Sequence, residues 1–234
     1  MKGIILAGGS GTRLYPLTKI TSKQLLPVYD KPMIFFPLDT FITAGIKEIL
    51  VIVAPEHAGH FLNLLGDGSE FGVKISFAIQ REPNGIAQAF LLGENFIGKD
   101  SVALILGDNI FEDNFSNYIK NFESGAQIFV REVHDPKRFG VIEFDKNKKV
   151  LSLEEKPKNP KSNFAQTGLY LCDNSVIEKT KKLSPSPRGE LEITDVMKKY
   201  LAEKTLTAEI ITKKWFDCGT HESLFFASEW QKNR

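Results

Sequence analysis

The sequence contains very little cysteine. Among its 234 residues only Cys172 and Cys218 carry thiols, and they are far apart. Two thiols without metal-ligand spacing make neither a zinc site nor a disulfide framework in a chain of this size. Disulfide-rich and zinc-bound folds are therefore excluded, and a reducing, cytoplasmic setting is expected.

An excess of charge and long apolar runs are also missing. Thirty lysines and arginines offset 29 aspartates and glutamates, which leaves a net charge of +1. Such a balance gives no electrostatic reason to expect nucleic acid or a membrane surface as a partner. The opening strand runs directly into glycines, so no signal peptide is expected, and no later run approaches bilayer-spanning length. We expect a soluble, unprocessed protein.

Hydrophobic residues make up 42% of the chain, which is enough for one large core. In the first half, short apolar runs alternate with longer amphipathic stretches, which favours crossover units and a mainly parallel sheet. In chain order, the runs and stretches are 3–7, 33–44, 48–54, 57–65, 74–79, 87–96 and 102–106. Almost continuously apolar strands at 49–53 and 102–106 predict helices on both faces of the sheet. The expected class is therefore α/β, with a Rossmann-like, doubly wound sheet.

The pattern changes after Gly125. Residues 139–144 and 150–155 alternate in period two around a turn-rich segment, which predicts a hairpin. Helical spacing follows at 190–203 and 222–231. No repeat or low-complexity linker interrupts the chain, so we expect a single domain, 1–234. This domain is expected to have two differently patterned halves, residues 1–125 and residues 126–234, of which the second adds antiparallel strands.

A glycine-rich loop, Gly8-Gly9-Ser10-Gly11-Thr12-Arg13, follows the first strand. Glycines allow backbone N–H groups to approach phosphates closely. The loop is not a Walker A motif, because no Gly-Lys-Ser/Thr follows, and Leu14 occupies the third glycine position of a dinucleotide fingerprint. It predicts a phosphate cradle, with a tight connection as the alternative.

Five charged residues carry the expected chemistry. Lys23 is a candidate second cation for a bound triphosphate, although lysines in loops are usually solvated. Asp108 follows an apolar strand at the edge where open α/β sheets bind ligands, with a turn or helix-cap role as its alternative. Asp217 is a candidate second carboxylate for Mg²⁺. Glu155 beside Lys156 is either a sugar-phosphate site or a surface ion pair.

Taken together, the motifs resemble the sugar-1-phosphate nucleotidyltransferases, and most closely the glucose-1-phosphate thymidylyltransferase family, from Met1 to about Glu222. Besides the glycine loop, the family-like stretches are 22–33, 65–68, 107–111, 154–157, 167–170, 188–195 and 217–222. Their number and order make chance similarity negligible.

The resemblance implies that residues 1–125 form a nucleotide-binding half and residues 126–234 a sugar-phosphate-binding half. It also implies an activity and roles for particular residues. The activity is Mg²⁺-dependent transfer of a nucleotidyl group from dTTP to glucose 1-phosphate. Arg13, Lys23, Asp108, Lys156 and Asp217 would be catalytic, with Asp108 and Asp217 on the metal. The dTTP would be bound by Gly8, Gly9, Gly11, Thr12, Arg13, Lys23, Gln80 and Gly85. The sugar phosphate would be bound by Asn109, Gly140, Glu155, Lys156, Gln166 and Arg188.

The chain departs from the family pattern at several positions. Phe139 replaces a tyrosine and Gln166 a valine near the expected sugar site, and a buried Gln166 would demand hydrogen-bond partners. Cys218 replaces a threonine and is interpreted as structural. The sequence ends at Arg234, where well-known bacterial members continue through further helices, so the resemblance implies a short form. It is compatible with a homo-oligomer.

Three alternatives stay open from the sequence. The same chemistry could use UTP, CTP or another hexose 1-phosphate. The chain could be a catalytically silent sugar-nucleotide-binding module, since fold and site can part company. A nicotinamide dehydrogenase is the third, although its fingerprint is imperfect.

Overall fold

The computed structural model describes all 234 residues, which form two compact units. Unit 1 comprises Met1–Pro83, Leu104–Lys120 and Lys213–Arg234, and unit 2 comprises Asn84–Ala103 and Asn121–Thr212. The chain passes between them inside strand β6 (Val102–Leu106). Each unit is thus assembled from separate stretches of sequence.

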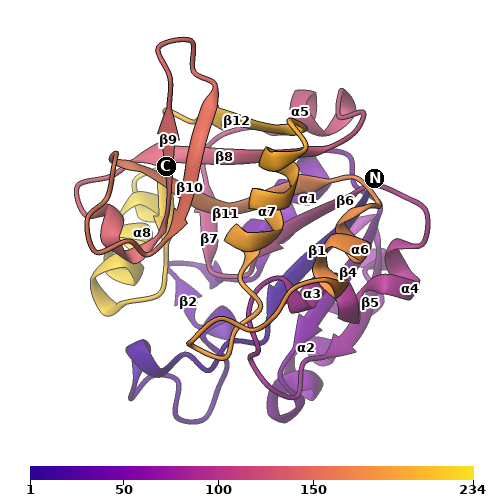
Figure 1. Cartoon of the computed structure of the whole chain (residues 1–234). Helices are drawn as coiled ribbons and strands as arrows, with labels where there is room; N and C mark the ends of the chain where they lie inside the picture. The colour runs from indigo at the N-terminus through magenta and orange to yellow at the C-terminus, as the bar shows by residue number, and fades with distance from the viewer. The chain divides into compact units, whose positions relative to one another are not determined.

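Unit 1 is built on three parallel strands. β4 (Glu48–Val53) lies between β1 (Lys2–Ala7) and β5 (Lys74–Ile79) and pairs in parallel with both (Figure 1). Every residue of β4 except Glu48 is buried, as expected for a strand covered on both faces. Two helices connect these strands, α1 (Phe35–Thr43) after β1 and α2 (Ala58–Leu65) after β4.

The rest of unit 1 joins early and late sequence. β7 (Asn109–Phe111) pairs antiparallel with β13 (Trp215–Asp217), and β2 (Pro27–Val28) pairs with β3 (Lys31–Pro32). α5 (Ser116–Lys120) follows β7, and α8 (His221–Lys232) follows β13. The N-terminus of α8 is closed by a capping box, in which Thr220 and Ser223 exchange hydrogen bonds.

In unit 2 most of the strand pairs are antiparallel. β11 (Phe164–Cys172) pairs antiparallel with β8 (Ala126–Glu132) and with β9 (Gly140–Phe144). β9 forms a hairpin with β10 (Val150–Glu155), and β12 (Leu206–Ile210) runs parallel to β8. The helices of the unit are α3 (Gln88–Leu92), α4 (Glu94–Ile97), α6 (Val176–Lys181) and α7 (Ile193–Ala202).

The predicted α/β class, with a mainly parallel sheet and added antiparallel strands, is confirmed. Within the stretch 87–96 the structure has two short helices, α3 and α4, which meet at Gly93. The unit boundary at 120/121 lies near the expected 125, yet 84–103 and 213–234 belong to the opposite unit from their half of the sequence. The single-domain count stays a prediction. None of the helices combines the length and apolar character needed to cross a membrane.

Candidate functional site

The glycine loop of unit 1 is shaped by close side-chain approaches. A Cβ on Gly8 would stand 2.2 Å from Oε1 of the buried Gln80, so only glycine leaves room for that amide. Gly9 lies 3.7 Å from Nζ of Lys23, measured from the position of an added Cβ. Gly11 has a left-handed φ of 64°, and Thr18 donates to its carbonyl at 2.8 Å. A single 3₁₀ turn, Thr12–Leu14, follows the loop.

Lys23 forms a nearly buried ion pair with Asp108. Its ammonium donates to Oδ2 of Asp108, and the two side chains are 14% and 8% exposed. Burial alone would raise the pKa of Asp108, but the charge and hydrogen bond of Lys23, helped by Asn109, lower it. Asp108 is therefore held as a carboxylate inside the unit. The solvated-lysine alternative for Lys23 does not hold.

Backbone and side-chain hydrogen bonds together hold Asp108 in place after β6. The N–H of Gly107 donates to the carbonyl of Leu6, which joins the end of β6 to the end of β1. The side-chain amide of Asn109 donates to Oδ1 of Asp108 at 3.1 Å, and the indole of Trp215 donates to Oδ1 of Asn109 at 2.7 Å. Asn109 and Trp215 therefore orient the carboxylate.

Asp217, in the C-terminal segment of unit 1, lies close to the segment that contains Asp108 and Asn109. In the register of β7 and β13, Asp217 stands opposite Asn109, and the N–H of Cys218 donates to the carbonyl of Asp108 at 2.9 Å. A Cβ on Gly219 would lie 2.6 Å from Nη2 of Arg13 and 3.2 Å from Oδ1 of Asp217. The structure thus brings Arg13 and Asp217 together, which sequence alone could not establish.

Cys218 is a packing residue. It is fully buried in a cluster with Val28, Met33, Ile110 and Ala227. Burial, followed by the nearby carboxylates of Asp108 and Asp217, raises the pKa of its thiol well above the ordinary value. The structural interpretation of Cys218 agrees with this environment.

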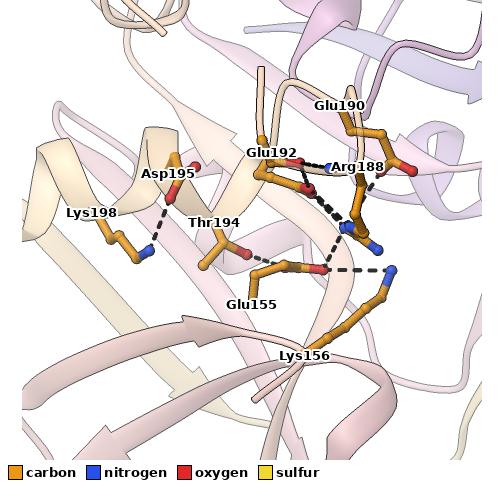
Figure 2. A network of polar contacts seen from close by, with 9 residues as sticks. Glu155, Lys156, Arg188, Glu190, Glu192, Thr194, Asp195 and Lys198 are labelled. Atoms are coloured by element: carbon orange, nitrogen blue, oxygen red, sulfur yellow. Dashed lines mark hydrogen bonds and ion pairs between the residues drawn. The ribbon is translucent and has the colours of Figure 1, made fainter. Parts of the chain in front are cut away.

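Unit 2 holds a second polar cluster, centred on Arg188 (Figure 2). Its guanidinium contacts Glu192 at 2.8 Å, Glu155 at 3.3 Å and Glu190 at 3.5 Å. Burial would lower the pKa of Arg188, but the hydrogen bonds and charge of Glu192, with the other two carboxylates, raise it. Three carboxylates therefore surround the one arginine of the cluster.

The end of β10 and the start of α7 complete this cluster. Thr194 donates to Oε2 of Glu155, and Nζ of Lys156 lies 3.6 Å from Oε1 of the same carboxylate (Figure 2). Lys156 is exposed and adopts a left-handed φ of 42°, which is uncommon for a residue with a side chain. Glu155, only 20% exposed in its side chain, is thus more than the partner in a surface ion pair.

Gln166 and Gly140 lie together in unit 2. Oε1 of Gln166 lies 2.9 Å, and Oγ1 of Thr194 3.1 Å, from the position of a Cβ on Gly140. Gln166 is 5% exposed, and neither polar atom of its side chain has a hydrogen-bond partner. The sequence predicts that a buried amide at this position needs hydrogen-bond partners. The amide is indeed buried, but the protein itself supplies none of these partners.

The predicted residues fall into two groups. Those placed in unit 1 are Gly8, Gly9, Gly11, Thr12, Arg13, Lys23, Gln80, Asp108, Asn109 and Asp217, and those placed in unit 2 are Gly85, Gly140, Glu155, Lys156, Gln166 and Arg188. Two of them lie in a different unit from the other residues predicted to bind the same substrate. Gly85 packs against the backbone of Leu191 in unit 2, and Asn109 orients Asp108 in unit 1. Their predicted substrate contacts stay predictions.

Several neighbours of these groups were not among the predicted residues. Trp215 in unit 1, and Glu192 and Thr194 in unit 2, hold the predicted residues by hydrogen bonds. Arg188 and Glu192 are four residues apart, but they lie before α7 in a segment that is not helical, so helical spacing does not signal their contact. The other contacts depend on tertiary structure.

Comparisons with known proteins identify relatives of this chain. The profile of the family described as Nucleotidyl transferase matches residues 2–233. Glucose-1-phosphate thymidylyltransferase of Neisseria meningitidis is 55% identical, with 97% of this chain and 81% of the relative covered. The Mycobacterium tuberculosis enzyme of the same name is 53% identical, with 98% and 81% covered.

Solved structures share the fold. A Bacillus anthracis protein assigned the same activity, solved in complex with a sucrose, superimposes with a TM-score of 0.95 at 46% identity, covering 100% of this chain and 96% of that one. A UDP-glucose pyrophosphorylase complexed with UDP-glucose has a TM-score of 0.87 at 24% identity, covering 100% and 99%, and supports the fold alone.

The chain therefore belongs to the nucleotidyl transferase family. Within that family, the predicted resemblance to the glucose-1-phosphate thymidylyltransferases is confirmed along nearly the whole chain, and so is the enzyme class. The dehydrogenase alternative is removed by the same match.

Proposed function

We propose that this enzyme transfers a thymidylyl group from dTTP to glucose 1-phosphate, with Mg²⁺ as its cofactor, and releases pyrophosphate. The observation that carries the proposal is the ion pair of Lys23 and Asp108, held next to the glycine loop with Arg13 and Asp217 close by. A buried cation and carboxylates beside a glycine loop fit the phosphates and metal of a nucleoside triphosphate.

Residues of unit 1 bind the nucleotide in this proposal. Backbone N–H groups of Gly8, Gly9, Gly11 and Thr12 face the phosphates, and Arg13 and Lys23 offset their charge. Gln80 reads the base, because its amide can both donate to and accept from the imide edge of thymine. The approach of Gln80 to Gly8 supports this grouping.

Asp108 and Asp217 fit a magnesium ion. They are hard oxygen ligands on neighbouring segments of paired strands, and Asp108 is held ionised. No group of three or more His, Cys, Asp or Glu residues is placed to hold a metal. Mg²⁺ commonly uses only one or two protein carboxylates and takes its other ligands from phosphates and water. When bound, it would neutralise charge on the phosphates.

Residues of unit 2 bind the sugar phosphate. Glu155, Gly140 and Gln166 are proposed to face the hydroxyl groups, and the exposed Lys156 is proposed to hold the phosphate. Arg188 is already neutralised by three carboxylates. Its proposed role is therefore to orient Glu155 as much as to attract an anion.

The chemistry needs no protein nucleophile. A phosphate oxygen of the sugar phosphate forms a bond to the α-phosphorus of dTTP, and the bond from that phosphorus to the pyrophosphate oxygen breaks in line. The attacking oxygen is already anionic, so a general base has little to do. The protein instead positions two polyanions and offsets their repulsion with Arg13, Lys23 and Lys156.

Pyrophosphate release from a matrix of nucleoside triphosphates and hexose 1-phosphates, with and without Mg²⁺, tests the proposal. We expect metal-dependent release that is highest with dTTP and glucose 1-phosphate. A different best pair would move the specificity, and an absence of release with every pair would overturn the proposal.

The setting of the reaction belongs to the same proposal. We place it in the cytoplasm, which the two buried, unpaired cysteines support. Sedimentation of the purified chain would establish whether it forms a homo-oligomer, which its family membership allows.

A further inference from the structure

Gln166 is a buried amide that the fold does not satisfy. It is 5% exposed, and neither Nε2 nor Oε1 has a hydrogen-bond partner. Leaving a buried polar group unpaired costs about 1–3 kcal/mol, whereas an apolar side chain of similar size would cost nothing of this kind. Such a residue needs a reason beyond packing.

The backbone around Gln166 aims its side chain at one spot. The pairing of β11 with β8 shifts register between Gln166 and Tyr170, and such irregularities redirect side chains. On the other side, Ala165 pairs with Val141 of β9, so Gln166 comes next to Gly140.

The amide can come this close because residue 140 is a glycine. A Cβ there would be 2.9 Å from Oε1 of Gln166 and 3.1 Å from the hydroxyl of Thr194. Thr194 in turn donates to Glu155, which pairs with Gly140 across the hairpin. An amide, a hydroxyl and a carboxylate therefore gather around one glycine, with the amide still unpaired.

These groups match a carbohydrate. A primary amide presents a donor and an acceptor side by side in one plane, and two hydroxyls on adjacent ring carbons offer the reverse arrangement. We propose that Gln166 binds two adjacent hydroxyl groups of the sugar phosphate, one accepting from Nε2 and one donating to Oε1, and thereby selects against deoxygenated sugars. This inference rests on the proposed function.

The test asks, for each hydroxyl of the sugar in turn, whether the loss of activity on removing it depends on the side chain of Gln166. Initial rates are measured for the wild type, Gln166→Leu and Gln166→Glu with glucose 1-phosphate and with analogues that each lack one hydroxyl. For two adjacent positions, removal of the hydroxyl should lower kcat/KM of the wild type at least about ten-fold and that of Gln166→Leu by less than about three-fold. Gln166→Glu should keep the coupling at only one of the two positions, because it retains an acceptor and loses the donor.

Equal losses in the wild type and Gln166→Leu at every position would overturn the inference, while activity of the wild type with glucose 1-phosphate would still support the proposed function. An inactive wild type would instead reject the proposed function. Thermal unfolding without substrate is the folding control. Because Gln166 is unpaired, Gln166→Leu should keep or raise Tm, and a lower Tm without coupling would show that the amide is satisfied within the protein, which also contradicts the inference.

Discussion

At the scale of single residues, two lysine–aspartate ion pairs in unit 1 differ in how far their side chains are exposed to solvent. Lys23 and Asp108 are 14% and 8% exposed, whereas Lys31 and Asp39 are 32% and 53% exposed at a similar N–O separation. An exposed pair contributes about 0–1 kcal/mol, but a buried charge that loses its partner is strongly destabilised. Only the buried pair therefore constrains the chemistry of its neighbourhood.

Asp108→Asn should abolish most turnover. The change removes a charge proposed to bind metal at nearly constant volume, and it leaves Lys23 without a carboxylate. We expect kcat to fall about 10²–10³-fold or more while the folded structure remains, measured by pyrophosphate release and circular dichroism. The matched control is Asp39→Asn, which breaks the exposed pair and should leave kcat within about two-fold. Wild-type rates of Asp108→Asn at saturating Mg²⁺ would contradict the metal-binding role.

What the sequence predicts at this scale is residue identity more than contact. The motifs single out Lys23, Asp108 and Asp217, but the pairing of Lys23 with Asp108 spans 85 positions and leaves no local signal. The approach of Asp217 depends on the register of β13 with β7. Gln166 is the exception: a buried amide without partners could be anticipated from its replacement of an apolar residue.

At the scale of elements, Asp173 ties four segments of unit 2 together. Oδ2 accepts from the N–H of Gly125, which precedes β8, at 2.7 Å. Oδ1 accepts from the N–H of Ser175 at 3.0 Å, just before α6, and from the hydroxyl of Tyr200 in α7 at 3.0 Å. Asp173 itself follows β11 directly. One carboxylate thus fixes where β11 ends and α6 begins.

Asp173→Asn should lower stability in a pH-dependent way. Burial would raise the pKa of Asp173, but the hydrogen bonds from Ser175, Gly125 and Tyr200 outweigh it and lower the pKa. Its contribution is therefore complete above the unfolded pKa of about 4 and is lost as the pH falls through the lower folded value.

Urea unfolding at a series of pH values measures this contribution. We expect the variant to be about 1–3 kcal/mol less stable than the wild type at neutral pH, with the gap closing below about pH 4. Asp195→Asn, which removes a surface pair with Lys198 on α7, should cost less than about 0.5 kcal/mol at neutral pH. A gap that stays constant with pH would contradict the assignment to the carboxylate.

Elements with strong periodicity are the ones the sequence predicts. β5 and β6 begin and end where their apolar runs do, and the hairpin of β9 and β10 surrounds the expected turn. Elements that follow from pairing with distant segments are different. β7 and β13 are three residues each and exist as strands because they pair with each other from distant parts of the chain, with Trp215 opposite Phe111 and Asp217 opposite Asn109.

At the scale of the whole molecule, the two units do not follow the order of the sequence. Unit 1 takes its last segment from Lys213–Arg234, which supplies Asp217 and α8. Phe216, Leu224 and Trp230 from this segment pack against the cluster that contains Val28 and Met33. The first 125 residues therefore hold only part of the structure to which their glycine loop belongs.

A fragment of residues 1–125 should fail to fold. It lacks β13, so β7 has no partner, and it lacks Cys218 and Ala227, so Val28, Met33 and Ile110 lose apolar contacts. We expect no cooperative thermal transition by circular dichroism, against a sharp transition for the full chain. A cooperative transition with native-like spectra would show that residues 1–125 fold independently.

The late segment also sets an order of events during synthesis. The side chain of Gln231 donates to Asp30 across 201 positions of the chain, and α8 joins the cluster around Val28. On the ribosome, Val28 and Met33 emerge early, but the apolar surface around them stays uncovered until the segment Lys213–Arg234 has been translated. Closing so large a loop is slow, and exposed apolar surface promotes association in the meantime. The early segment around Val28 thus completes its packing only after α8 has been made.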